Sequence, residues 1–153
     1  MTIRPAQAGD YSQIYSLVQT AFATAKVSDG TEQDFVLELR RRDTYRPELE
    51  LVAEENGQLI GHILLTILPV PGAPQGLRGL MVAPLCVRLE DRSRGLGGQL
   101  LHEGGAGRRS WGTTPCFWWA TRTTTAGTAS RTPSPWGSKT PPACPTSFYW
   151  HWG

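Results

Sequence analysis

The sequence predicts an α/β domain, and three observations lead to that prediction. The chain has 153 residues with a hydrophobic content of 39%, which suits one domain with a single buried core. Strand-like and helix-like apolar patterns alternate along its first two thirds, as in a sheet with helices packed on it. The last third lacks these patterns, and we expect it to be irregular or disordered.

The first segments predict a strand followed by two helices. Thr2–Pro5 is expected to form the strand. Asp10 offers an N-cap for the first helix, with Gln13 three residues later, as in a capping box. A second helix is expected from Thr31. The basic run Arg40–Arg42 would lie at its solvated C-terminal end, where positive charge suits the helix dipole.

Two strands joined by a tight turn are expected next. Glu48–Glu55 alternates polar and apolar residues, which predicts a strand with one wet face. Asn56-Gly57 is a strong hairpin signal, and Leu59–Leu68 is apolar almost throughout, as in a strand buried on both faces. We interpret His62 as facing a wet edge of that strand rather than as a catalytic base.

A loop rich in arginine and glycine follows another strand, Leu80–Val87, and opens a helix. Backbone N–H groups at a helix start have no internal partner, and the helix dipole adds positive potential, so such a loop can hold an anion. The spacing fits neither a Walker loop nor a dinucleotide fingerprint. The alternative is a glycine-rich helix start packed against the sheet. The residues that would shape an anion site are Arg92, Arg94, Gly95, Gly97 and Gly98.

This part of the chain resembles the GNAT superfamily of acyl-CoA-dependent N-acetyltransferases over residues 1–104. Leu85-Cys-Val87 followed by Arg92-Ser-Arg-Gly95-Leu-Gly97 is similar to the family's pyrophosphate motif, (Gln/Arg)-x-x-Gly-x-(Gly/Ala), which follows its fourth strand. The order of strands and helices is also similar. The resemblance implies a mixed central sheet with flanking helices.

The resemblance also implies acetyl-CoA as co-substrate. The amides from Arg92 to Gly98 would cradle its pyrophosphate. The Leu85–Val87 backbone, splayed from its neighbour strand near Pro84, would lie along the pantetheine. The cofactor-binding residues implied are Leu85, Cys86, Val87, Arg92, Ser93, Arg94, Gly95, Leu96, Gly97 and Gly98.

The reaction implied is direct attack of a neutral primary amine on the acetyl-CoA thioester. A base or water chain would take the amine's proton, and backbone N–H groups near the fourth strand would stabilise the oxyanion. In many family members a tyrosine helps the thiolate leave, but the chain has no tyrosine between Tyr45 and Tyr149. Catalytic residues therefore stay unassigned. Glu54, Glu55 and His62 are weak base candidates, because a strand face explains them more simply.

The spacing of the cysteines and the lengths of the apolar runs limit the kinds of site and the cellular location that we expect. Cys86, Cys116 and Cys144 are odd in number and lack metal-site spacing, so they favour neither a disulfide framework nor a metal site. We interpret Cys86 as a packed apolar residue, because no activating base is evident. No apolar run approaches the roughly 20 residues of a membrane helix, and Met1–Pro5 lacks a secretory layout. We expect a cytoplasmic protein, with a small-molecule or peptide amine as acceptor and a homodimer as one assembly.

Composition changes abruptly near Glu103. All 13 acidic residues lie at or before it, whereas residues 105–153 hold five basic residues and all six tryptophans. A basic, Trp-rich tail is able to stack on single-stranded nucleic acid, but no fold or repeat supports that partner. We therefore expect two parts: residues 1–104, the first part of an acetyltransferase domain, and an aberrant Thr/Pro/Trp-rich tail over residues 105–153.

The tail is also consistent with translation in a shifted reading frame. Phe117-Trp-Trp-Ala120, regrouped by one base, permits Leu-Val-Gly. One permitted spelling of Ala120–Ser130 regroups to Gly-Asp-Pro-Asp-Tyr-Tyr-Gly-Arg-Tyr-Gly-Phe, which is similar to a string in one GNAT branch. The hypothesis is that a frameshift near Glu103–Ala106 replaces the family's C-terminal half.

Three functions stay open at this point: an N-acetyltransferase by lineage, a non-catalytic acyl-CoA-binding remnant, and a basic binding module. For the chain as written we expect weak or absent CoA binding and no measurable transfer.

Overall fold

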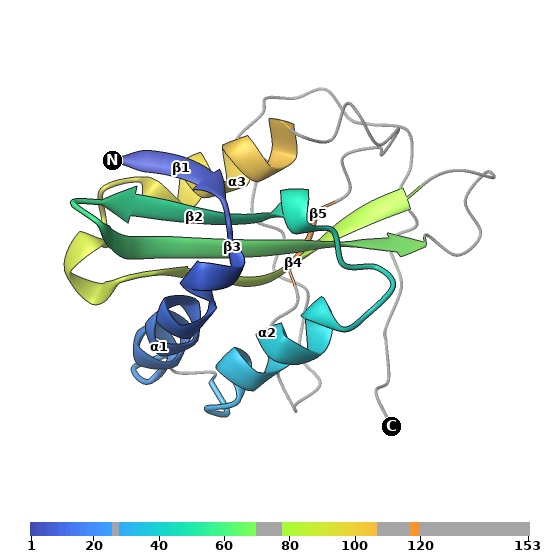
Figure 1. The fold of residues 1–153 in the computed structure, drawn as a ribbon, viewed down its shortest axis with the longest axis horizontal. Coiled ribbons are helices and arrows are strands. Elements are labelled where there is room, and N and C mark those ends of the chain that lie inside the picture. Colours follow the sequence, from blue (N-terminus) through green and yellow to red (C-terminus); the bar gives the residue numbers. More distant parts are fainter. Residues whose placement is uncertain (26–27, 70–77, 107–116, 120–153) are drawn as a thin grey trace. The chain divides into compact units, whose positions relative to one another are not determined.

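The structure is a computed structural model that describes residues 1–25, 28–69, 78–106 and 117–119. The chain divides into two units, residues 1–123 and 124–153, and every described residue belongs to the first. That unit contains a sheet with helices on both of its faces (Figure 1). The predicted α/β class and mixed sheet are confirmed.

Within the described residues the sheet has five strands, which lie side by side in chain order. They are β1 (Thr2–Pro5), β2 (Glu50–Glu55), β3 (Gln58–Pro69), β4 (Arg78–Val87) and β5 (Phe117–Trp119). The first four pair antiparallel, and β5 pairs parallel with β4. The Asn56-Gly57 turn between β2 and β3 is confirmed. Both residues have positive φ, 53° and 76°, as the favoured two-residue hairpin turn requires.

Helices α1 (Tyr11–Phe22) and α2 (Glu32–Arg40) cover one face of the sheet, and α3 (Leu96–Ala106) covers the other (Figure 1). Each face has its own apolar core. Ile14, Val18, Val36 and Leu39 of α1 and α2 share one core with sheet residues Val52 and Leu64. Leu96 and Leu100 of α3 share the second core with Ile60, Ile63 and Leu65.

Helix α3 packs closely on the sheet at two glycines. A Cβ added at Gly61 of β3 would lie 2.9 Å from Leu100 Cδ1, and one added at Gly104 of α3 would lie 2.6 Å from Leu65 Cδ1. Glycine permits this approach because it has no side chain. The contacts fix the height of α3 above the sheet, and with it the position of the loop that precedes the helix.

Two predictions near the sheet are wrong in detail. The Asp10 side chain does not cap α1. Instead its Oδ2 accepts hydrogen bonds from the Gln7 amide at 2.8 Å and from Arg4 Nη1 at 2.6 Å. Pro47–Leu49 forms a 3-10 turn, so the second strand begins at Glu50. Residues 50–53 have no wet face, because α1 and α2 cover one side of them and α3 the other.

The structure describes a short strand, β5, in the segment for which we expected irregular structure. Its backbone pairs with Leu80–Val82 of β4. Gly105 and Ala106 of the tail end α3, and the rest of the tail lies outside the described residues.

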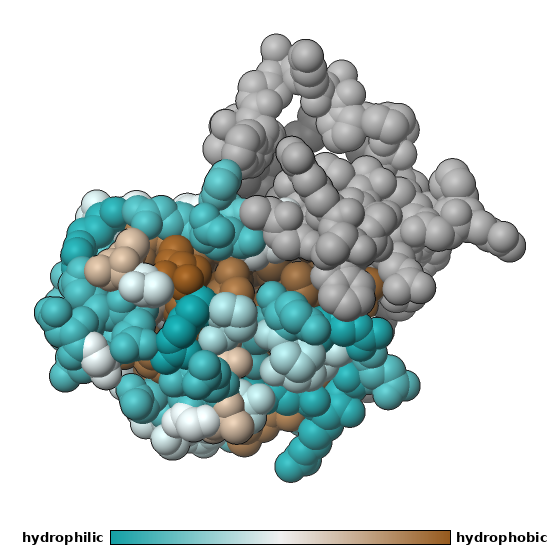
Figure 2. Space-filling model, turned by 45° about the horizontal axis from the view of Figure 1, so that its top comes forward, coloured by the Kyte–Doolittle hydropathy of each residue, from teal (hydrophilic) through white to brown (hydrophobic). Residues whose placement is uncertain are grey.

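On the face turned forward in Figure 2, hydrophilic residues predominate, and a band of hydrophobic residues crosses the middle. Partly buried Ile3, Leu85, Val87 and Leu101 belong to the α3 side of the sheet. Among the helices that the structure describes, none is long and apolar enough to cross a membrane.

Candidate anion-binding site at the start of helix α3

The glycine-rich loop joins β4 to α3. After β4 the chain makes a 3-10 turn, Leu89–Asp91, and then passes through four exposed residues, 92–95, before α3 begins at Leu96. Ser93 and Gly95 have φ values of 64° and 76°, in the left-handed region. These two residues turn the chain from the strand into the helix, and Gly95 does so without the strain that a Cβ brings.

The start of α3 offers backbone amides to solvent. Gln99 N–H donates to Gly95 O at 3.2 Å, which is the first turn of the helix. The amides of Leu96, Gly97 and Gly98 precede that bond, so they have no acceptor within the helix. A Cβ added at Gly95 or Gly98 would meet no atom within 4 Å. The helix start is packed against the sheet through Leu96, which is buried, while Gly95 and Gly98 have open space around them.

Arg92 ties the loop to two other elements. Its Nη2 donates to the carbonyl of Ala21, near the end of α1, at 2.8 Å, and its Nε donates to the Val87 carbonyl at 3.3 Å. Carbonyl oxygens carry no net charge, so these bonds leave the guanidinium's positive charge uncompensated.

Arg94 is paired with two carboxylates. Its Nη1 lies 2.5 Å from Asp91 Oδ1, and its Nη2 lies 3.2 Å from Glu55 Oε1. Asp91 also accepts from Arg88 Nε at 2.6 Å. The hydrogen bonds from Arg88 and Arg94 hold the pKa of Asp91 below its usual range. We expected the positive charge of Arg94 to attract an anion. Asp91 and Glu55 already balance that charge.

The β5 side of β4 is paired over part of its length. Pairing with β5 covers Leu80–Val82, and the described residues give Ala83–Val87 no partner on that side. The Ala83–Pro84 peptide at this point is cis. Cys86 is buried, and burial raises the pKa of its thiol to about 12. Its burial confirms the interpretation of Cys86 as a packed residue.

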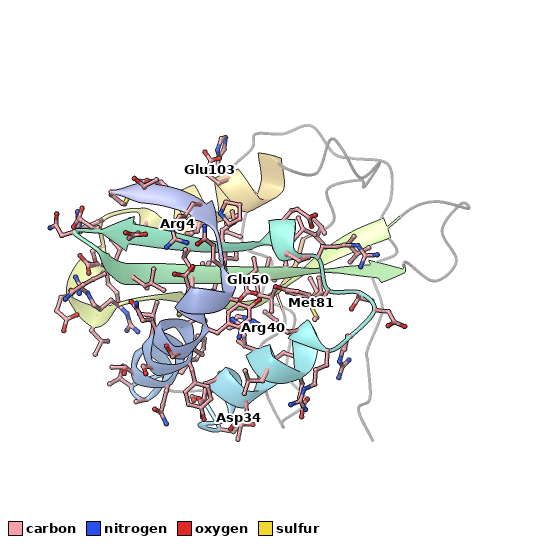
Figure 3. The ribbon with its side chains drawn as sticks, viewed as in Figure 1. Arg4, Asp34, Arg40, Glu50, Met81 and Glu103 are labelled. Carbon is pink, nitrogen blue, oxygen red and sulfur yellow. The ribbon has the colours of Figure 1, made fainter. Side chains whose placement is uncertain are left out.

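A buried polar cluster lies on the α1–α2 side of the sheet, centred on the fully buried Glu50. Arg40 reaches from α2 toward Glu50 on β2 (Figure 3), with Arg40 Nη2 2.5 Å from Glu50 Oε1. Tyr45 Oη donates to Glu50 Oε2 at 2.8 Å. Burial alone would raise the pKa of Glu50, but hydrogen bonds with His62 and Arg40 outweigh it and lower the pKa to about 2. Arg40 is therefore not part of the solvated helix end we expected, although Arg41 and Arg42 are exposed.

His62 is fully buried, so the expectation that it faces a wet edge is wrong. Its Nε2 lies 2.9 Å from Glu50 Oε1. Burial lowers the pKa of His62 despite the opposing effect of Glu50. The neutral ring therefore donates its Nε2 proton to Glu50. Its Nδ1 has no hydrogen-bond partner within the described part of the chain.

The other two base candidates are also paired. Glu54 Oε2 accepts from Arg4 Nη2 at 2.7 Å, and Glu55 pairs with Arg94. Sequence reasoning missed both Asp91 and the Glu50 cluster. One signal for the cluster is present in the sequence: Val52 is apolar, although it lies on the face of β2 that was expected to be wet. In the structure Val52 pairs with His62 of β3.

The arrangement of sheet and helices is that of the GNAT fold. The family model described as "Acetyltransferase (GNAT) domain" matches residues 2–128, and the chain belongs to this family.

Particular relatives agree with that assignment. The uncharacterized N-acetyltransferase YjhQ of Escherichia coli K12 is 34% identical over 95 residues, which are 62% of this chain and 50% of YjhQ. The chain thus spans half the length of this curated relative.

Two solved structures are also similar. A GNAT family acetyltransferase from Brucella melitensis, in complex with acetyl-CoA, has a TM-score of 0.62 and 34% identity. That match covers 71% of this chain and 68% of the other. The Escherichia coli N-acetyltransferase YhbS, in complex with CoA, has a TM-score of 0.59 and 29% identity, and the match covers 73% of this chain and 58% of YhbS.

Proposed function

We propose that this chain is by lineage an acetyl-CoA-dependent N-acetyltransferase domain whose acceptor is a primary amine on a small molecule or peptide. We also propose that it binds CoA, in place of the weak or absent binding expected from the sequence, because the loop and α3 are both formed. The observation that carries the proposal is the start of α3, where exposed loop residues and helix amides without an intrahelical acceptor follow the part of β4 that no described residue pairs on the β5 side. Similarity to family structures holding acetyl-CoA or CoA supports it. A cytoplasmic location and a homodimer belong to the same proposal.

The geometry fits the chemistry of CoA. Its pyrophosphate is an anion, which the amides of residues 92–98 and the positive end of the α3 dipole would receive. Its pantetheine arm carries amide groups, which would face the unpaired β5 side of residues 83–87. The acceptor nitrogen attacks the thioester carbonyl carbon, the C–S bond breaks, the amine loses a proton and CoA leaves as a thiol.

A second candidate is a non-catalytic form that binds acyl-CoA without transferring the acyl group. One observation favours it: Glu54, Glu55 and His62 are all paired with other side chains. A thiol-release assay with acetyl-CoA and a panel of primary amines separates the two candidates. Amine-dependent release supports the transferase, and CoA binding without release supports the second form.

Calorimetric titration of the full chain with CoA tests the proposal. Gly95→Ala places a Cβ on a residue with φ of 76°, and we expect its CoA affinity to fall several-fold as the loop shifts to relieve about 1–2 kcal/mol of strain. Gly30→Ala is the matched control, because Gly30 has φ of 80° and similar open space but lies outside the loop. A folded chain that does not bind CoA, or equal losses in the two variants, would contradict the proposal.

A further inference from the structure

We propose that Asp91 is a positioning residue of the loop at the start of α3. It holds Arg88 and Arg94 in place, so that backbone amides rather than the side chains of these two arginines receive the anion. The inference rests on the proposed function, because the anion in question is the pyrophosphate of CoA. It goes further in assigning a role to a carboxylate that would otherwise repel that ligand.

Asp91 is nearly buried, with 5% of its surface exposed, and both of its oxygens are occupied. Oδ2 accepts from Arg88 Nε at 2.6 Å, and Oδ1 accepts from Arg94 Nη1 at 2.5 Å. The two arginines lie on either side of the turn from β4 toward α3. One carboxylate therefore fixes the distance between the beginning and the end of this turn.

The same two arginines continue to the β2–β3 hairpin. Arg88 Nη1 donates to Gln58 Oε1 at 2.9 Å, and Arg94 Nη2 donates to Glu55 Oε1 at 3.2 Å. Glu55 and Gln58 flank the Asn56-Gly57 turn, which has a fixed geometry. Through Arg88 and Arg94, Asp91 links the loop to a rigid part of the sheet.

Charge counting leads to the same conclusion. Around the loop, Arg88 and Arg94 form ion pairs with the anions Glu55, Glu90 and Asp91. Arg92 is bonded to two carbonyl oxygens, and its charge offsets the excess of one anion in that group. Side-chain charge thus adds little net attraction for a phosphate, and the helix amides and dipole must supply it. Coulomb repulsion from a nearly buried carboxylate beside an anion site would by itself lower the affinity for the anion. Any benefit of Asp91 to CoA binding therefore has to come from positioning.

The charge effect and the positional effect predict opposite results for Asp91→Asn. Loss of a negative charge should tighten CoA binding if Coulomb repulsion dominates. Loss of charge-assisted bonds to two arginines should weaken CoA binding if Asp91 is a strut, and we expect a weakening of about tenfold. Glu90→Gln is the matched control, because Glu90 carries the same charge but is 75% exposed and 3.6 Å from Arg88. We expect this variant to bind CoA at least as tightly as the unchanged chain.

A second ligand separates positioning of the loop from general loss of structure. S-acetylpantetheine lacks the phosphates of CoA. Asp91→Asn should therefore leave the dissociation constant of S-acetylpantetheine, measured by competition with CoA, unchanged. Thermal unfolding of each ligand-free variant controls for folding. If Asp91→Asn does not fold, Glu55→Gln replaces it, because Glu55 is the other carboxylate paired with Arg94. Weaker CoA binding by Glu55→Gln supports positioning, and tighter binding supports Coulomb repulsion.

The outcomes distinguish the inference from the proposed function. A folded, unchanged chain that does not bind CoA overturns the proposed function, and the role of Asp91 falls with it. If the unchanged chain binds CoA, then equal or tighter binding by Asp91→Asn overturns the inference about Asp91 alone. Equal weakening toward CoA and S-acetylpantetheine also overturns it.

Discussion

Glu50 shows how one buried charge joins the elements on the α1–α2 side of the sheet. Its carboxylate is bonded to Arg40 from α2, to Tyr45 from the following segment and to His62 from β3. A buried ion pair contributes little net stability relative to an apolar pair, but removal of one partner leaves the other charge uncompensated. The cluster therefore fixes where α2 lies over the sheet.

Glu50→Gln should lower the free energy of unfolding by about 3 kcal/mol, because it leaves the Arg40 guanidinium buried without a counter-ion. Urea denaturation measures this difference. Glu48→Gln is the control, since Glu48 is exposed on the preceding turn and its substitution should change stability by under about 0.5 kcal/mol. Equal effects of the two substitutions would contradict the role of Glu50.

The same cluster predicts acid-sensitive stability. His62 is neutral in the folded chain, whereas in the unfolded chain it takes up a proton below its ordinary pKa of 6.5. Glu50 has a folded pKa of about 2 against an ordinary value of 4.5. In both ranges the unfolded chain binds more protons, so stability falls as pH falls below 6.5 and again below 4.5.

Unfolding free energies measured across pH 7 to 3 test this prediction. Glu50→Gln should make the lower limb of the curve less steep, because glutamine does not titrate there, while Asp10, Glu55 and Asp91 keep their lowered pKa values. A profile of the unchanged chain that is flat over both ranges would contradict the buried pairing.

Pattern reasoning located the loop residues but not these partners. A glycine-rich stretch after a strand is visible as a motif, and Gly95 indeed needs its positive φ. The partners of Asp91 lie three residues away and those of Glu50 five to twelve residues away. Which of the nearby polar residues are buried together depends on how the helices pack on the sheet. Alternation along Glu48–Glu55 indicates a wet face. It carries no information about α1 and α2, which cover that face in the folded chain.

At the scale of elements, the position of α3 determines the position of the loop. Gly61→Val should place side-chain atoms against Leu100 and Leu96, because even a Cβ there would lie 2.9 Å and 3.3 Å from them. Overpacking of this kind lowers stability by about 1–3 kcal/mol. We expect Gly61→Val to unfold at lower temperature and also to bind CoA more weakly, because α3 must move.

Gly9→Val provides the control, since a Cβ at Gly9 would meet no atom within 4 Å. Thermal unfolding and CoA titration are measured on both variants. Equal stability of Gly61→Val and Gly9→Val would contradict the close packing of α3 on β3.

Most elements were predictable because their signals are local. The first strand, two helices, the Asn56-Gly57 turn and the loop before α3 each have a short-range pattern. The Pro47–Leu49 turn and β5 have none. A three-residue strand such as β5 is defined by its pairing with Leu80–Val82, and that partner lies in a distant part of the sequence.

At the scale of the whole molecule, we propose that residues 105–153 arise from a shifted reading frame. The abrupt loss of acidic residues after Glu103 and the gathering of all six tryptophans behind it support this proposal. Sequencing of the coding DNA from Leu100 to Thr114 should reveal one base gained or lost relative to related genes. An unbroken frame shared with those genes would contradict it and make the tail a native feature of the chain.

The central claim is that the amides at the start of α3 bind the pyrophosphate of CoA. Amide resonances of the ¹⁵N-labelled chain, followed while CoA is added, test it most directly. We predict that the largest shifts fall on residues 92–98, that Gly97 and Gly98 shift downfield as their N–H groups bond to phosphate, and that S-acetylpantetheine leaves them in place. CoA binding that shifts other residues and leaves these amides unchanged would contradict the account.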